Sequence, residues 1–208
     1  MLRRIMLCVM VALTLAGSVR SAERLFLLKI GPTWPKELQW SEKPTAWDGA
    51  IQSGLIFDRK VAFGGGIDFL WNVNKKAKPI SGTIYRLEKV ERTFMFPVSG
   101  FFSLDPVPDL LIHPCASIQI GLNTMYYSHK EDSDLPDTTL PNVDGWYMGF
   151  YLKIAADAIF NLGEQSGIFA GFEYQWSKPQ KLGVDSGDLF AERNMSGVGI
   201  RMGFRVIY

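Results

Sequence analysis

The last eleven residues of the chain alternate strictly between apolar side chains and polar or very small ones. Six apolar residues share one face of the resulting strand: Val198, Ile200, Met202, Phe204, Val206 and Tyr208. The opposite face carries Gly199, Arg201, Gly203 and Arg205. In a water-soluble protein the apolar face would be buried in the core, and a second face with arginines would not be buried as well. The pattern therefore predicts a strand that is apolar outside and polar inside.

The same period of two residues recurs in eight segments. They cover residues 24–32, 47–58, 61–73, 92–103, 111–127, 146–162, 167–177 and 198–208. In the third segment, Leu70 is the one apolar residue on the inner face. These segments predict an all-β fold, an antiparallel up-and-down transmembrane β-barrel of eight strands that spans residues 23–208. Ten strands remain possible if residues 83–91 extend the fourth segment or part of 182–193 forms a further hairpin arm.

The connections between the segments alternate in length. Short ones fall at residues 59–60, 104–110 and 163–166, and long ones at 33–46, 75–91, 128–145 and 178–194. Outer-membrane barrels have short turns on the periplasmic side and long loops outside. We therefore expect both termini in the periplasm and four long extracellular loops. Pro97 lies inside the fourth segment, where its missing N–H predicts a bulge or a locally weak pairing.

With this terminal strand and final aromatic, the chain resembles the family of small bacterial outer-membrane β-barrel proteins of the OmpA, OmpX or porin type. The resemblance implies an outer-membrane location, with lipid and lipopolysaccharide around the barrel. It also implies that the barrel assembly machinery recognises the last strand, so that Phe204, Val206 and Tyr208 form an assembly signal. It names no ligand for the loops.

The N-terminus supports this location. Arg3 and Arg4 precede an apolar run over residues 5–17, which predicts a secretory signal peptide over residues 1–22. After this segment the sequence contains no run of 18 apolar residues, which a membrane helix would need. Cleavage would remove three of the 22 basic residues and none of the 21 acidic ones. The nearly neutral product argues against a nucleic-acid partner. Only Cys115 would remain, as a small side chain facing the lumen.

Aromatic residues gather where strands meet the long connections. All six tryptophans fall in or beside these connections. We expect Trp71, Tyr126, Trp146 and Trp176 to form an aromatic girdle at one membrane interface, joined by Tyr127 and Tyr147.

Charged residues on the predicted inner face form the main candidate site. They are Lys29, Asp68, Lys153, Asp157, Glu173, Arg201 and Arg205. Four cations and three anions in a narrow barrel are expected to pair across the lumen, which would plug it. The alternative is a narrow polar pore in which Arg201 and Arg205 favour anions.

Catalytic chemistry has little support in the sequence. His113 lies at the start of the fifth segment and His129 in a predicted loop beside Ser128, and neighbouring strand residues point to opposite faces. We expect no enzyme, no cofactor and no metal site; the acidic residues of 128–145 are expected to be solvated, with Ca²⁺ binding as the alternative.

The predicted role is therefore structural, or a surface interaction through the long loops. The alternatives are a small passive pore and, less favoured, a lipid A-modifying or other outer-membrane enzyme. The structural rival is a soluble β-sandwich.

Overall fold

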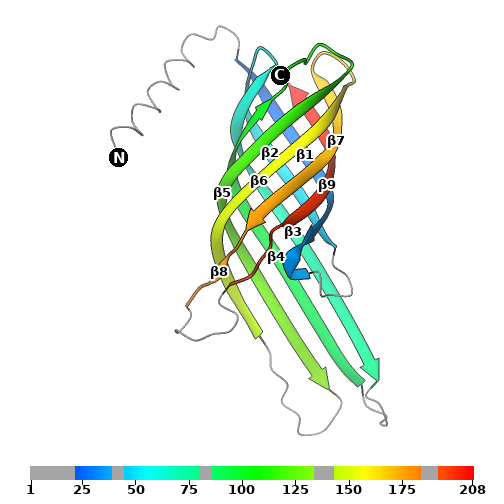
Figure 1. Ribbon diagram of the computed structural model, residues 1–208, viewed down its shortest axis with the longest axis vertical. Coiled ribbons are helices and arrows are strands. Elements are labelled where there is room, and N and C mark those ends of the chain that lie inside the picture. Colours follow the sequence, from blue (N-terminus) through cyan, green and yellow to red (C-terminus); the bar gives the residue numbers. More distant parts are fainter. Residues whose placement is uncertain (1–21, 39–44, 80–85, 134–142, 184–191) are drawn as a thin grey trace, which may run out of the picture.

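The computed structural model describes residues 22–38, 45–79, 86–133, 143–183 and 192–208 (Figure 1). Residues 1–21 of the predicted signal peptide lie outside these ranges. Within them, no helix is long and apolar enough to cross a membrane.

Eight long strands form the wall. They are β1 (Ala22–Pro35), β2 (Ala46–Phe57), β3 (Val61–Pro79), β4 (Arg86–Leu104), β5 (Ile112–Ser133), β6 (Val143–Asn161), β7 (Ser166–Ser177) and β9 (Gly197–Ile207). Each pairs with its neighbours in antiparallel fashion, and the pairings of β5 with β6 and of β1 with β9 close the sheet. A short 3₁₀ helix, η1 (Lys36–Leu38), follows β1, and β8 (Gln180–Lys181) pairs with β6. The predicted eight-stranded antiparallel barrel is thus confirmed.

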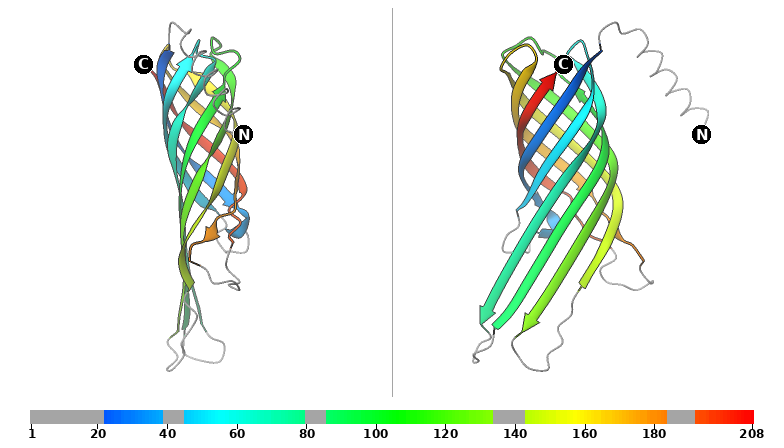
Figure 2. Two further views of the ribbon diagram at one scale, coloured as in Figure 1. Left: turned by 90° about the vertical axis from the view of Figure 1, so that its left-hand side faces the viewer. Right: turned by 180° about the vertical axis from the view of Figure 1, so that it is seen from behind.

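The register of the barrel fixes its shape. From Leu25 of β1, successive partners lead around the wall to Pro35 of the same strand, ten residues further along. They are Gly54, Gly64, Phe101, Gln119, Lys153, Gln175 and Gly197. An even displacement keeps the same face inside all the way round. This displacement of ten residues is larger than the number of strands, so the strands tilt strongly relative to the barrel axis, as Figures 1 and 2 show. Successive partners in one row therefore lie at different heights along the axis.

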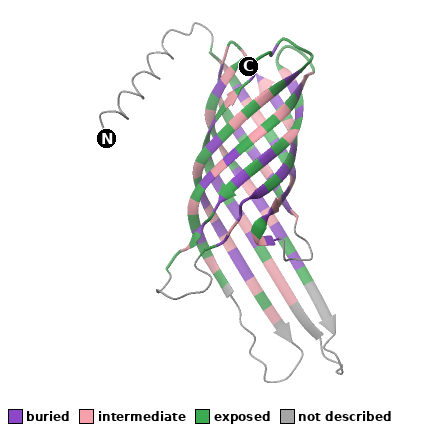
Figure 3. Cartoon of the chain, viewed as in Figure 1, coloured by how far each residue is buried: buried purple, intermediate pink, exposed green. Residues whose placement is uncertain are grey.

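The two faces of the wall differ in polarity. One row of partners across β1 to β6 is apolar and exposed: Leu28, Ile51, Ile67, Val98, Leu122 and Phe150. The exposed fraction reaches 61% at Leu122 and 70% at Phe172. Along β9, Arg201 and Arg205 are buried while Met202 and Phe204 are exposed. Figure 3 shows this alternation as a checked pattern on the strands.

An aromatic row crosses the outer face toward the end that bears the long connections. Trp47, Trp71, Phe94, Tyr126 and Trp146 are successive partners on β2 to β6. Trp176 on β7 packs against Phe150, with ring centroids 5.7 Å apart. The expectation for Tyr127 and Tyr147 is wrong: both are buried on the inner face, because each is one residue out of phase with the outer row.

The barrel has two unlike ends. Both ends of the described wall, Ala22 and Tyr208, lie with the short turns at one end, here the turn end. At the opposite, loop end, β3 to β6 continue past the rest of the wall. Residues 72–79 of β3 pair only with β4, since the pairing of β2 with β3 stops at Trp71. The described parts of the predicted loops 75–91 and 128–145 are therefore strand, and residues 86–91 do extend β4. We call this part the extension.

Pro97 interrupts its ladder as expected. The register of β3 against β4 is the same on both sides of Pro97, but the pairs at Asp68 and Phe69 are missing. On the other side, Pro97 keeps Asn123 of β5 as its partner. A residue without an N–H loses its ladder bonds on one side only, so the structure has a weak pairing and no bulge.

A substitution at Phe204 tests which face of the last strand lies on the outside of the barrel. Its side chain is 38% exposed on the apolar face. Replacing it by Asp should destabilise the barrel by roughly 1–3 kcal/mol, because a charge would face hydrocarbon. The measurement is the fraction that resists dodecyl sulfate before heating, on gels of boiled and unboiled membrane extracts. Phe204→Leu should match the wild type; wild-type folding of Phe204→Asp would contradict the facing.

Candidate functional site

The lumen gathers the predicted inner charges. All seven lie on the inner face, and Lys29, Asp68, Lys153, Glu173, Arg201 and Arg205 are buried. The side chain of Asp157 is 7% exposed. They come from β1, β3, β6, β7 and β9, so that the register alone brings them together.

Lys153 on β6 is the centre of this network. Its Nζ lies 2.8 Å from Asp68 Oδ2 and 3.4 Å from Glu173 Oε1, and it also pairs with Asp48. The Tyr151 hydroxyl donates to Asp68 Oδ2 at 2.8 Å. Strand β2, which carries Asp48, lies on the wall opposite β6. One ammonium therefore ties opposite walls together.

Asp48 is missing from the predicted set, although the sequence contains a signal for it. It follows Trp47, which faces outward, so strict alternation places it inside.

Arg201 on β9 forms the next level toward the turn end. Its Nε donates to Asp157 Oδ1 at 2.7 Å, and its Nη2 donates to Ser117 Oγ at 3.0 Å and also to Asp157. Nη1 lies 3.6 Å from Glu173 Oε2. Space for this pair depends on a glycine: a Cβ at Gly171 would stand 2.4 Å from Asp157 Oδ1. Arg201 thus links the Lys153 cluster to the contacts nearer the turn end.

Arg205 and Asp105 close the turn end. Arg205 Nη1 donates to Asp105 Oδ2 at 3.1 Å, and His113 Nδ1 lies 2.8 Å from Asp105 Oδ1. Asn161 holds the turn in place, because its Nδ2 donates to the carbonyl oxygens of Pro108 and Leu110. Asp105 follows β4, on the wall opposite β9. The sequence predicts that Asp105 lies in a turn, and alternation does not predict whether the side chain of a turn residue points into the lumen.

An apolar cluster fills the loop end of the lumen. Its buried members are Leu38, Ala46, Leu70, Met95, Met125, Tyr127, Tyr147, Tyr151 and Met195. Leu38 of η1 reaches in from a segment predicted as a loop, and Met195 from the three residues between the last predicted loop and the last predicted strand. Arg193 adds a cap: its guanidinium carbon lies 3.8 Å from the centroid of the Tyr127 ring, and its Nη1 donates to Glu37 at 2.6 Å. Leu70, the apolar residue on the inner face of the third predicted segment, belongs to this cluster.

His129 lies on the extension, and its predicted position in a loop is wrong. It occupies the part of β5 that pairs with β4, with Nδ1 3.2 Å from Glu91 Oε1 and Nε2 3.1 Å from Glu131 Oε1. A hydrogen bond from Lys89 lowers the pKa of Glu131. The described residues hold no group of three or more His, Cys, Asp or Glu placed to bind a metal. Residues 134–142 of the acidic segment lie outside the described residues.

These observations define a closed antiparallel eight-stranded barrel with a polar, ion-paired lumen and an apolar outer face. No family model matches the sequence, and no curated protein matches it.

Solved structures of small outer-membrane barrels are similar in shape. Neisserial surface protein A is 14% identical with a TM-score of 0.49, covering 91% of this chain and 100% of its own. A major outer membrane protein from Thermus thermophilus is 9% identical with a TM-score of 0.46, over 89% and 99%. The attachment invasion locus protein Ail of Yersinia pestis, solved with a heparin analogue, is 11% identical with a TM-score of 0.43, over 90% and 98%.

Lys153 offers a direct test of the network. Replacing it by Met leaves Asp48, Asp68 and Glu173 buried without their shared cation, so we expect a loss of about 3–5 kcal/mol in unfolding free energy. Urea unfolding of the barrel in lipid vesicles measures it. Adding Asp68→Asn to Lys153→Met should recover part of the loss, because one surplus charge is removed. Equal stability of Lys153→Met and the wild type would refute the network.

Proposed function

We propose that this protein is an integral outer-membrane barrel with a closed lumen, which acts through its extension at the cell surface. The exposed apolar rows of the wall require lipid, and a closed barrel satisfies its backbone hydrogen bonds inside a bilayer. In the proposed orientation, the turn end faces the periplasm and the last strand carries the signal for the assembly machinery.

The blocked lumen is the observation that favours a surface role over a pore. Three groups of contacts span it: the apolar cluster, the pairs of Lys153, and the pair of Arg205 with Asp105. Two of these join opposite walls. Solutes would have to break buried ion pairs to pass, so the chemistry available to partners lies outside the barrel.

Basic side chains stand on the outer face of the extension just beyond the aromatic row. Arg92 lies two residues beyond Phe94, while Lys75 and Lys130 lie four residues beyond Trp71 and Tyr126. These steps correspond to about 7 Å and 13 Å along a strand. All three residues are exposed and belong to neighbouring strands. We call Lys75, Arg92 and Lys130 the basic patch.

The position of the basic patch suits the phosphates of the outer leaflet. None of its three cations forms an ion pair within the described part of the chain, whereas Lys89 on the inner face pairs with Glu131. Asp144 on β6, an exposed acid nearby, is the partner of Ser128 on β5. Cations beside an interfacial aromatic belt attract anionic headgroups, by about 1 kcal/mol for each Lys or Arg near the surface. The patch would anchor the extension upright on the phosphates of lipopolysaccharide.

Vesicles of phosphatidylcholine with and without lipid A test this anchoring. Lipid A should raise the urea midpoint of the wild type, and the triple variant Lys75→Gln, Arg92→Gln, Lys130→Gln should lose most of that gain. The three cations together should contribute roughly 3 kcal/mol to the unfolding free energy in the presence of lipid A at low salt, and less at high salt. Arg59→Gln, which removes a partly exposed cation paired with Glu23 at the turn end, should keep the gain. An unchanged gain in the triple variant would exclude headgroup binding by the patch.

A further inference from the structure

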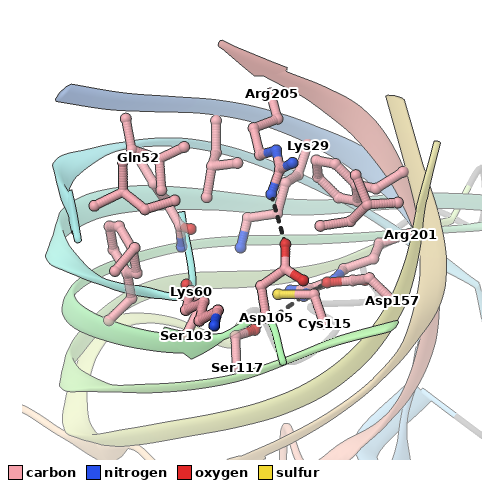
Figure 4. A pocket seen from close by; sticks show the side chains of 17 residues that line it. Lys29, Gln52, Lys60, Ser103, Asp105, Cys115, Ser117, Asp157, Arg201 and Arg205 are labelled. Atoms are coloured by element: carbon pink, nitrogen blue, oxygen red, sulfur yellow. Dashed lines mark hydrogen bonds and ion pairs between the residues drawn. The ribbon is translucent and has the colours of Figure 1, made fainter. Parts of the chain in front are cut away.

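A cavity of about 40 Å³ lies in the turn-end half of the lumen (Figure 4). This volume corresponds to about three water-sized positions. Apolar side chains form part of its wall: Leu25, Leu27, Ile56, Ala62, Phe101, Ile159 and Phe169. The rest of the lining is polar and comes from strands all round the barrel.

The charges of this lining are unequal. Lys29, Lys60, Arg201 and Arg205 face the cavity, against two carboxylates, Asp105 and Asp157. Each carboxylate already has its own arginine, since Arg205 pairs with Asp105 and Arg201 with Asp157. Lys60 is exposed at the mouth, so its ammonium keeps its water.

Lys29 is the buried cation left over. Its side chain points into the cavity in Figure 4, the residue is only 6% exposed, and no carboxylate oxygen of the described residues lies within 4 Å of its Nζ. The surplus carboxylates around Lys153 attract it from a distance without touching it. A buried ammonium needs contact partners to replace its hydration shell.

The unpartnered polar atoms of the lining are all donors. Gln52 Nε2, Arg201 Nη1 and Arg205 Nε are buried N–H donors that donate no hydrogen bond within the described residues. Arg201 Nη1 lies 3.6 Å from Glu173 Oε2, beyond hydrogen-bond distance. Gln52 also points into the cavity in Figure 4. Asp48 Oδ1 and Asp68 Oδ1 are acceptors without a hydrogen-bond partner, and they belong to the Lys153 level instead.

We propose that this cavity binds a small, weakly hydrated inorganic anion of the halide class, such as chloride. The anion would contact Lys29 Nζ and Gln52 Nε2 and rest against the apolar wall. Excess positive charge and unpaired N–H donors favour an anion, the apolar wall favours one that gives up its water easily, and the volume excludes large oxyanions.

Salt-specific stability tests this site. Thermal unfolding of the folded barrel in neutral detergent is followed at constant ionic strength while sodium fluoride is replaced by sodium bromide or chloride. The melting temperature of the wild type should rise and saturate with bromide and chloride, because a ligand of the folded state stabilises it by mass action. Lys29→Met should weaken the apparent halide affinity at least tenfold. Lys178→Met, at an exposed lysine near the loop end, should leave it unchanged.

Two further measurements guard against a variant that does not fold. Gln52→Leu removes a neutral donor and should weaken halide affinity several-fold without changing the charge. Anomalous scattering from wild-type crystals soaked in bromide should place an ion within hydrogen-bond distance of Lys29 Nζ. A melting temperature that does not distinguish bromide from fluoride, with no anomalous peak in the cavity, would overturn the proposal and leave a cavity filled with water.

Discussion

The contact of Lys153 with Asp48 runs from one wall of the barrel to the opposite wall, and the rest of the structure depends on contacts of this kind. A barrel of eight strands is too narrow to keep its inner charges hydrated. Most of these charges have a partner from another part of the wall, because an unpaired buried charge costs several kcal/mol; among the described residues, Lys29 is the exception. Arg205 and Asp105 repeat the solution at the turn end. The same contacts that stabilise the wall therefore block the lumen.

With the lumen closed as proposed, the surfaces available for a function lie on the outside of the barrel. In the proposed function the apolar outer rows face lipid, and the aromatic row lies where the wall leaves the lipid. Beyond that row, β3 to β6 continue as a sheet that carries basic residues on the face that continues the lipid-facing wall. Polar contacts on the other face, between His129, Glu91 and Glu131, hold the sheet together. In this proposal the wall is the part that inserts into the membrane, and the extension is the part that makes contacts at the surface.

Alternation along the strands was enough to predict the fold and the inner position of residues such as Lys153 and Arg201. It fails where the chain leaves a regular strand. Asp105 lies in a turn, and Leu38 and Met195 in connections, yet all three fill the lumen, because tertiary packing decides their direction. The extension is longer than the pattern predicts, since residues 75–79 and 86–91 are too polar to be recognised as strand. Its pairing comes from the ladder with β4 and β5 and needs no apolar face.

Charge in the lumen is also divided along the axis. Carboxylates outnumber cations around Lys153, whereas cations outnumber carboxylates around the turn-end cavity. No pattern in the sequence predicts this separation, because alternation gives the face of a residue but not its height relative to residues of distant strands. The register, with its displacement of ten residues per circuit, sets those heights.

The closed lumen is the central claim, and single-channel recording in planar lipid bilayers tests it most directly. The wild-type barrel, inserted and shown to be folded by its heat-dependent gel mobility, should give no current steps above the bilayer baseline at either polarity. Discrete and reproducible steps from the folded wild-type protein would contradict the account, because ions could then pass the contacts of Lys153 and Arg205 that span the lumen.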